Sequence, residues 1–312
     1  SVPSLRQRAW ARGQRPQRMP KGLTAMAELR ELQRYIENTK ALGEIVQAMR
    51  NLAGVYVRRA ESTIQATRPY RDIVNSALAA ALDAADWPVL ETDDDAPSVL
   101  VVFASDQGLC GTYNERVIDC AGDFIDSKPL TEVMVIGRRG EGLLQQRGIE
   151  PIVAADAPTS LEGIRSRVAD LSERLFQAFS AAGAEHLFFA YNEYESMGRF
   201  QPTVRRVLPP ARDDLTADPA VAFPSEPILT ASPDRLLGRF MEEYFFINLY
   251  GTLLESHGSE NGARLLAMTA AAANIDKRLV DLTKKYQNAR QEMVTSELLD
   301  VVGGAEALQT QE

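Results

Sequence analysis

Apolar or small side chains recur at alternating four- and three-residue steps near both ends of the chain. The first series runs through Leu42, Val46, Met49, Ala53, Tyr56 and Ala60, and the second through Met268, Ala272, Ile275, Leu279, Leu282, Tyr286, Ala289 and Met293. Such spacing places each series on one stripe of a helix and is typical of a coiled-coil seam. The pattern predicts a helix over residues 26–85 and another over 234–312, paired antiparallel as a coiled coil.

Two glycines lie inside the first predicted helix. Gly43 and Gly54 each destabilise a helix by about 1 kcal/mol relative to alanine. Either tertiary packing compensates for this loss, or a close backbone approach requires the glycines.

Short β-branched runs alternate with helical patterns over residues 97–208. The expected strands are 97–104, 132–136, 152–154, 186–191 and 202–208, and the expected helices are 114–126, 139–147 and 160–182. This alternation predicts a parallel sheet covered by helices, and the last two strands are close enough in sequence to form an antiparallel hairpin. Residues 209–233 are rich in proline and acidic side chains and are expected to be a linker. The predicted fold class is α/β, with a Rossmann-like domain inserted between the two coiled-coil helices.

The composition of the 312 residues narrows the classes of function. Its 34 lysines and arginines against 43 acidic residues give a net charge of -9, which disfavours a general nucleic-acid binder because phosphate attracts positive charge. Two cysteines cannot build a disulfide framework, and the two histidines form no cluster with zinc spacing. No apolar run approaches the roughly 18 residues that cross a bilayer. We therefore do not expect a metal-centred enzyme built on nitrogen and sulfur ligands, and we expect a chain that is soluble or peripheral to a membrane.

The first 25 residues differ from the rest. They carry Arg6, Arg8, Arg12, Arg15, Arg18 and Lys21, and no acidic residue occurs before Glu28. Prolines interrupt the segment, so we expect a disordered basic extension. Its composition suits an organelle transit peptide, a solvated tail or an upstream misread start.

Glycine loops after the first two predicted strands are candidate phosphate sites. Residues 108–111 could cradle a phosphate at a helix N-terminus, but they match neither GxGxxG nor GxxxxGK[ST]. A structural turn around a buried Cys110 is favoured, and Cys120 is also interpreted as a buried thiol. The loop after the second predicted strand contains Gly137, Gly140 and Gly142. It also lacks the complete nucleotide-binding pattern, so we interpret it as a tight turn.

Polar residues of the C-terminal helix are candidates for contacts with a partner. His257 lies beside Glu255, Ser256 and Ser259, but neighbours on a continuous helix diverge, so His257 is interpreted as a solvated or interface residue. Glu260 and Arg264 are spaced i, i+4 and form either a surface pair or a recognition point. Arg290 and Gln291, with Thr295 and Glu297, form a polar band beside the seam, and taken alone this band favours a solvated face.

Two separated blocks carry a recognisable signature. Residues 105–111 read SDQGLCG and are followed by Tyr113-Asn114. The closing block contains Glu255-Ser256, Ser259-Glu260, Ala263-Arg264, Ala267-Met268, residues 286–291, Thr295, Glu297 and residues 303–305. The first helix adds Met26, Thr39-Lys40, Ala48-Met49 and residues 58–60. In order and spacing these residues resemble the gamma subunit of F-type ATP synthases over about residues 26–308.

The resemblance implies a rotor that is not itself an enzyme. The family's helices form an antiparallel coiled coil inside the catalytic alpha–beta ring, and rotation couples a proton- or sodium-conducting c-ring to catalysis on the beta subunits. The implied partners are alpha, beta, epsilon and the c-ring, with no nucleic acid and no cofactor. The implied location is peripheral, on the cytoplasmic face of a bacterial inner membrane, or on the matrix side of the mitochondrial inner membrane if residues 1–25 are a targeting remnant.

The resemblance also assigns roles to residues. Arg290, Gln291, Thr295 and Glu297 would contact a beta-subunit loop, Glu260 and Arg264 would lie at a coupling contact nearer the stalk, and residues 301–308 would turn in an apolar bearing. The chain departs from the family in residues 50–57, which lack the usual lysines, and at Glu44, where a lysine is common. These departures favour either a divergent lineage or a variant F-type ATPase whose partners have co-adjusted.

Two other classes of protein remain open. A nucleotide- or small-molecule-binding α/β protein that oligomerises through its helices would have a ligand pocket at the carboxyl edge of the sheet. A coiled-coil tether would self-associate stably.

Overall fold

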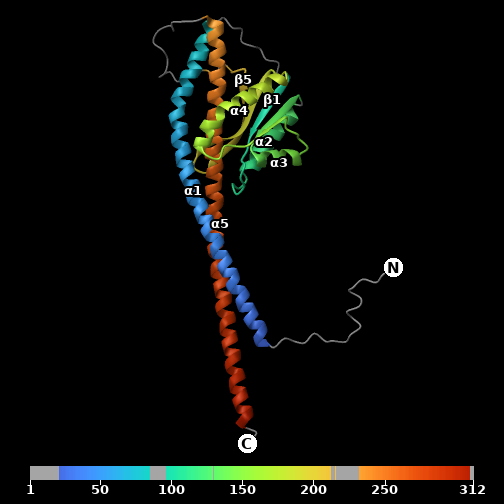
Figure 1. The fold of residues 1–312 in the computed structure, drawn as a ribbon, viewed down its shortest axis with the longest axis vertical. Helices are drawn as coiled ribbons and strands as arrows, with labels where there is room; N and C mark the ends of the chain where they lie inside the picture. The colour runs from blue at the N-terminus through green and yellow to red at the C-terminus, as the bar shows by residue number, and fades with distance from the viewer. Residues whose placement is uncertain (1–20, 85–95, 129, 212–214, 216–231, 310–312) are drawn as a thin grey trace, which may run out of the picture. The chain divides into compact units, whose positions relative to one another are not determined.

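The structure is a computed structural model that describes residues 21–84, 96–128, 130–211, 215 and 232–309 (Figure 1). In chain order the elements are α1 (Lys21–Ala84), β1 (Ser98–Phe103), α2 (Tyr113–Ser127), β2 (Thr131–Ile136), α3 (Arg138–Gln146), β3 (Val153–Ala155), α4 (Leu161–Ala181), β4 (His186–Ser196), β5 (Arg199–Leu208) and α5 (Pro233–Gln309). The predicted basic extension, apart from residues 21–25, and most of the predicted linker lie outside the described residues. The first helix begins at Lys21, earlier than Met26, where it was expected to start.

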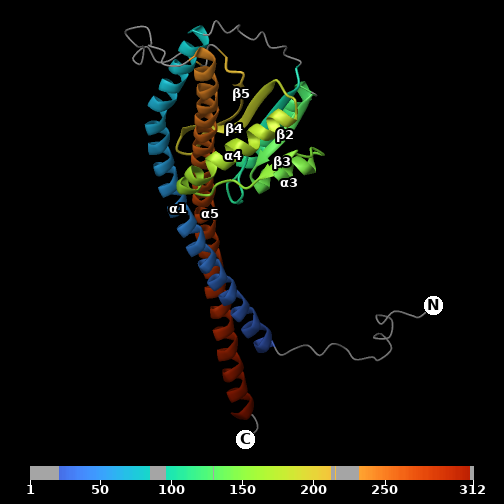
Figure 2. The ribbon, with the colours of Figure 1, turned by 45° about the horizontal axis from the view of Figure 1, so that its top comes forward.

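The chain divides into two compact units. The larger spans residues 47–270, and the smaller combines the described residues up to Val46 with those from Ala271 onward. The larger unit holds the α/β domain, which lies alongside the first half of α5 (orange in Figure 2). None of the described helices has the length and apolar character that a bilayer crossing requires.

The sheet of the larger unit has the strand order β3-β2-β1-β4-β5. The first four strands are parallel, and β5 returns antiparallel to β4, which confirms the predicted parallel sheet and terminal hairpin. The hairpin is longer than predicted: β4 continues to Ser196, and β5 already begins at Arg199.

Side chains of β1 alternate between two apolar cores, as the two-residue period of a strand requires. Val99, Val101 and Phe103 face a core shared with α4, α5 and α1. Leu100 and Val102 face the other core, with α2 and α3. Every residue of β1 is buried, which is the usual state of a central parallel strand.

The predicted stripe of α1 is buried or half-buried except at Leu42, and several positions next to it are also covered. The buried or half-buried positions include Gly43, Val46, Arg50, Ala53, Val57 and Ala60. Leu42 is 53% exposed, so its assignment to the seam was wrong. Two adjacent stripes of α1 share Val46, Ala53 and Ala60 and have the same alternation of four- and three-residue steps. Periodicity alone cannot decide which of the two stripes is buried.

Gly43 has a packing role within the smaller unit. A Cβ atom at this position would lie 3.2 Å from Cγ2 of Ile275, so the glycine permits a close approach of α1 to α5. Gly54, in the larger unit, is not crowded, because its nearest atom from another element, Cδ1 of Leu265, would lie 3.8 Å from an added Cβ.

The residues assigned to the seam of α5 are buried or half-buried. Met268 is 5% exposed in the larger unit. Within the smaller unit the half-buried seam residues are Ile275, Leu279, Leu282, Tyr286, Ala289 and Met293, and the flanking residues from Asp276 to Glu292 are exposed except at these positions. Met49, the seam residue predicted on α1, is half-buried.

Candidate functional site

The SDQGLCG loop is held together by its own side chains. Asn114, near the start of α2, accepts the backbone N–H of Ser105 at 2.9 Å and donates from Nδ2 to Ser105 Oγ at 2.9 Å. Ser105 Oγ in turn donates to the carbonyl oxygen of Gln107 at 2.7 Å. Ser105 and Asn114 are both buried, so this part of the signature maintains a loop shape.

The carboxylate of Asp106 joins the ends of three strands. Its Oδ1 accepts the backbone N–H groups of Arg138 and Ala157, each at 3.0 Å. Arg138 is the first residue of α3. In a nucleotide-binding fold, the backbone N–H groups at such a helix N-terminus donate to a bound phosphate. The adjacent Gly137 has a φ of 115°, and a Cβ there would lie 2.4 Å from the carbonyl oxygen of Ala104. The carboxylate of Asp106 therefore occupies the position at the start of α3 where the alternative interpretation, a ligand-binding α/β protein, would place a ligand.

Cys110 and Cys120 differ in environment. Cys110 is 2% exposed, and burial raises the pKa of its thiol, which keeps the thiol protonated and unreactive. Cys120 is only partly buried, in contrast to the expectation of a buried thiol. Burial again contributes most to raising its pKa, with Asp123 adding to it.

Leu109 has the unusual geometry in this loop, and sequence reasoning missed it. Its φ is 64°, a left-handed conformation that is unfavourable for a leucine, and its side chain is 61% exposed. A strained, exposed leucine in a loop with otherwise buried anchors is a candidate contact residue.

Glu260 and Arg264 form an ion pair in which Arg264 is buried and Glu260 is half-buried. Their side chains are 14% and 9% exposed, so the surface-pair interpretation was wrong. Arg264 Nη2 donates to Glu260 Oε1 at 2.5 Å and to the carbonyl oxygen of Gly108 at 3.3 Å, and Nη1 donates to Asn261 Oδ1 at 3.1 Å. Burial raises the pKa of Glu260, and the guanidinium of Arg264 opposes that shift. The pair thus attaches α5 to the SDQGLCG loop.

His257 is an interface residue and is not solvated. It is 4% exposed, and its ring lies 5.9 Å from the ring of Tyr56 on α1. Burial, with a smaller contribution from Arg264, lowers its pKa to about 4, so the imidazole is neutral at physiological pH. Among the described residues no group of histidine, cysteine and acidic side chains could hold a metal ion.

The polar band near the end of α5 is open to solvent. Arg290, Gln291, Thr295 and Glu297 are exposed, and Thr295 Oγ1 donates to the carbonyl oxygen of Gln291 at 2.8 Å. The structure therefore leaves these four residues on the surface of one helix and places Glu260 and Arg264 inside the larger unit.

Exposed apolar side chains lie within this band and beyond it. Val294, Leu298, Leu299, Val301 and Val302 are between 44% and 71% exposed. So many adjacent apolar side chains on a helix surface indicate a contact with another molecule.

Comparisons with known proteins agree on one family. A family model described as ATP synthase matches residues 28–308. The ATP synthase gamma chain of Bdellovibrio bacteriovorus is 30% identical over 297 residues, covering 91% of this chain and 99% of the relative. That of an Anaeromyxobacter species is also 30% identical over 297 residues, covering 91% of this chain and all of the relative, 100%.

Solved structures show the same fold. A rotational state of the Euglena gracilis mitochondrial ATP synthase, described as OSCP/F1/c-ring, contains a chain with a TM-score of 0.64 and 14% identity, matched over 91% of this chain and 95% of that one. The central stalk and c-ring structure of the Tetrahymena thermophila mitochondrial ATP synthase gives a TM-score of 0.55 and 19% identity, over 73% of this chain and 99% of that one. With its two terminal helices, its inserted α/β domain and its two signature blocks, the chain belongs to the ATP synthase gamma chain family.

Proposed function

We propose that this chain is the central rotor stalk of an F-type ATP synthase and transmits torque between a membrane c-ring and a catalytic alpha–beta ring. Catalysis takes place on the beta subunits, and this chain performs no chemical step. Its partners are alpha, beta, epsilon and the c-ring, and it is peripheral to the membrane through them. We place it on the cytoplasmic face of a bacterial inner membrane, with the mitochondrial matrix side as the alternative.

The smaller unit carries this proposal. Its described residues come only from α1 and α5, and its α5 side chains form a half-buried seam with polar and apolar residues exposed around it. A stiff helix pair with an asymmetric outer surface can favour different conformations in three otherwise equivalent sites, because each site meets a different face.

The exposed end of α5 supports specific contacts. Arg290, Gln291, Thr295 and Glu297 bind a loop of beta, and residues 301–308, which begin with the exposed Val301 and Val302, turn in an apolar bearing. Glu260 and Arg264 act at the coupling contact nearer the stalk by holding the loop that presents Leu109.

A photo-cross-linking experiment tests this arrangement. The variant Thr295→Cys, labelled with a maleimide-benzophenone in the intact complex, is expected to cross-link to beta or alpha on irradiation and to stop ATP hydrolysis in proportion to the yield. Ser180→Cys on α4, also exposed, serves as the matched control and should leave hydrolysis unchanged. Equal yields of alpha and beta adducts at both positions would contradict the proposal.

A further inference from the structure

The β4–β5 hairpin projects beyond the part of the sheet that β1 covers. β4 pairs with β1 from His186 to Ala190, but it continues to Ser196 with β5 as its partner on the other side. Past Ala190, the free edge of β4 carries backbone groups that need hydrogen-bond partners.

Polar side chains of α5 supply these partners. Ser259 Oγ donates to the carbonyl oxygen of Asn192 at 2.9 Å, and the carboxylate of Glu255 accepts the backbone N–H of Tyr194. Asn192 is fully buried, and Ser259 is 1% exposed. One stripe of α5 therefore takes the place of the next strand.

The start of α2 joins the same contact. Asn192 Nδ2 donates to the carbonyl oxygen of Tyr113 at 2.9 Å, and the hydroxyl of Tyr113 donates to the carbonyl oxygen of Ser256 at 3.1 Å. Tyr113 is fully buried, and it packs with Cys110, Ala263 and Phe200. Hydrogen bonds among the buried residues Tyr113, Asn192, Ser256 and Ser259 thus connect the hairpin, α2 and α5.

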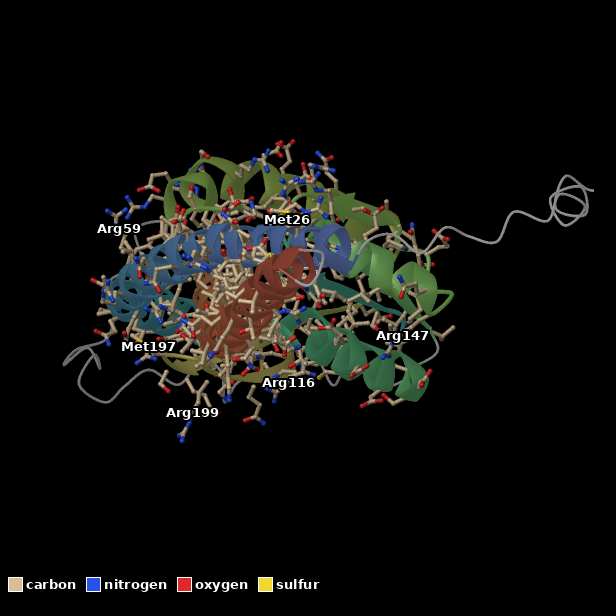
Figure 3. All side chains as sticks on the ribbon, turned by 90° about the horizontal axis from the view of Figure 1, so that it is seen from below. Met26, Arg59, Arg116, Arg147, Met197 and Arg199 are labelled. Carbon is tan, nitrogen blue, oxygen red and sulfur yellow. The ribbon has the colours of Figure 1, made fainter. Side chains whose placement is uncertain are left out.

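Glycines allow the backbones of the hairpin and of α5 to approach each other closely. A Cβ at Gly262 would lie 3.0 Å from the backbone nitrogen of Gly198 at the hairpin tip, and a Cβ at Gly258 would lie 3.3 Å from Cδ2 of Tyr194. Gly198 has a φ of 78°, and a Cβ there would lie 2.8 Å from Cδ1 of Leu266. Figure 3 labels Met197 and Arg199, which flank this glycine at the tip of the hairpin.

We propose that this contact is the joint through which torque passes between the α/β domain and the shaft. The hairpin joint consists of Glu255, Ser259, Gly262 and Leu266 on α5 and of Asn192, Tyr194 and Gly198 on the hairpin. The inference rests on the proposed rotor function. Buried hydrogen bonds from α5 side chains and the close backbone approach of Gly262 to Gly198 hold the hairpin firmly against α5, so the joint transmits force with little local deformation. The Glu260–Arg264 pair lies on the same stretch of α5 and adds a second attachment through the SDQGLCG loop.

The test uses two substitutions of the same type on α5. Gly262→Leu inserts a side chain where the hairpin tip lies, whereas Gly251→Leu inserts one where an added Cβ has no heavy atom within 4 Å. Each variant is assembled into the complete ATP synthase in membrane vesicles, and ATP hydrolysis and ATP-driven ion pumping are measured on the same preparation. The ratio of pumping to hydrolysis is the readout, because a merely structural loss of complex lowers both activities together.

The inference predicts that Gly262→Leu lowers the ratio of pumping to hydrolysis by about fivefold or more, since overpacking displaces the hairpin while the shaft still turns in the ring. Gly251→Leu is expected to retain the unmodified ratio. An unchanged ratio in assembled Gly262→Leu complexes would overturn the joint and leave the rotor function intact.

If Gly262→Leu prevents assembly, Gly262→Ala replaces it, compared with Gly251→Ala. Its Cβ is tightly placed against Gly198, so a smaller fall of the ratio in the same direction is expected. No fall relative to Gly251→Ala would again overturn the joint. Absence of the chain from active complexes would instead contradict the proposed function itself.

Discussion

Asp106 Oδ1 accepts the backbone N–H of Arg138 at 3.0 Å, so a side chain from the end of β1 caps α3. The same oxygen accepts the N–H of Ala157, and the carboxylate is 5% exposed. Asp106→Ala would leave both donors without this acceptor. We expect the free energy of unfolding to fall by about 2 to 3 kcal/mol in urea titrations of the full chain.

Asp156→Ala is the matched control for this change. Asp156 also pairs with Arg138, but the two side chains are 56% and 69% exposed, so its loss should change stability by less than about 0.5 kcal/mol. Equal effects of the two substitutions would show that Asp106 is not the structural cap. Tight nucleotide binding by the unmodified chain would revive the ligand-binding alternative.

Removing Glu260 from the Glu260–Arg264 pair should leave an uncompensated charge, because Arg264 is buried. Glu260→Ala leaves the guanidinium without its carboxylate and is expected to cost about 3 kcal/mol of unfolding free energy. The double variant Glu260→Ala/Arg264→Ala should cost clearly less than the sum of the two single variants. Strict additivity would argue that the two residues act independently.

The exposed pair of Arg147 and Asp119 provides the comparison. Their side chains are 42% and 60% exposed, and Asp119→Ala should lower stability by less than about 1 kcal/mol.

His257 should make the fold sensitive to mild acid. Its pKa is lowered to about 4 in the folded chain, whereas an unfolded histidine titrates near its ordinary value of 6.5. The unfolded state therefore binds the proton first as the pH falls. The stability contribution of the neutral imidazole is complete above pH 6.5 and is lost as the pH falls towards 4.

The measurement is the unfolding free energy of the unmodified chain and of His257→Gln between pH 7.5 and 4.5. The difference between the two curves should shrink on acidification by up to about 3 kcal/mol. Glu255 and Glu260, whose pKa values are raised by burial, change stability in the opposite direction, but they are present in both chains and cancel in the difference. Parallel curves would contradict a neutral, buried His257.

The two glycines of α1 should respond differently to alanine. Gly54→Ala adds a Cβ at ordinary contact distance and is expected to stabilise the chain by about 0.5 to 1 kcal/mol through helix propensity. Gly43→Ala places its Cβ 3.2 Å from Ile275, so this gain should be cancelled or reversed. Thermal unfolding followed by circular dichroism distinguishes them, and an equal rise in the transition midpoint would refute the close approach at Gly43.

Periodicity predicted the elements that depend on local pattern. The seam of α5 from Met268 to Met293 and the alternation of strands and helices over residues 97–208 follow from spacings within single segments. Leu42 was misplaced because two adjacent stripes of α1 fit the same spacing, and only the position of α5 decides between them.

Burial imposed by distant segments was not readable from the sequence. His257 and Arg264 were judged on helix geometry alone, but α1 and the SDQGLCG loop cover them. The hairpin was predicted too short because Asn192, Glu193 and Glu195 are polar, as in a turn. Their strand conformation depends on pairing with β5 and on a contact with α5, which lies far away in the sequence.

Native mass spectrometry of the complex purified from its own host tests the rotor function most directly. One copy of this chain with three alpha and three beta subunits is the predicted composition. A homodimer, or a monomer carrying a nucleotide with no alpha or beta subunit attached, would contradict the central-stalk assignment.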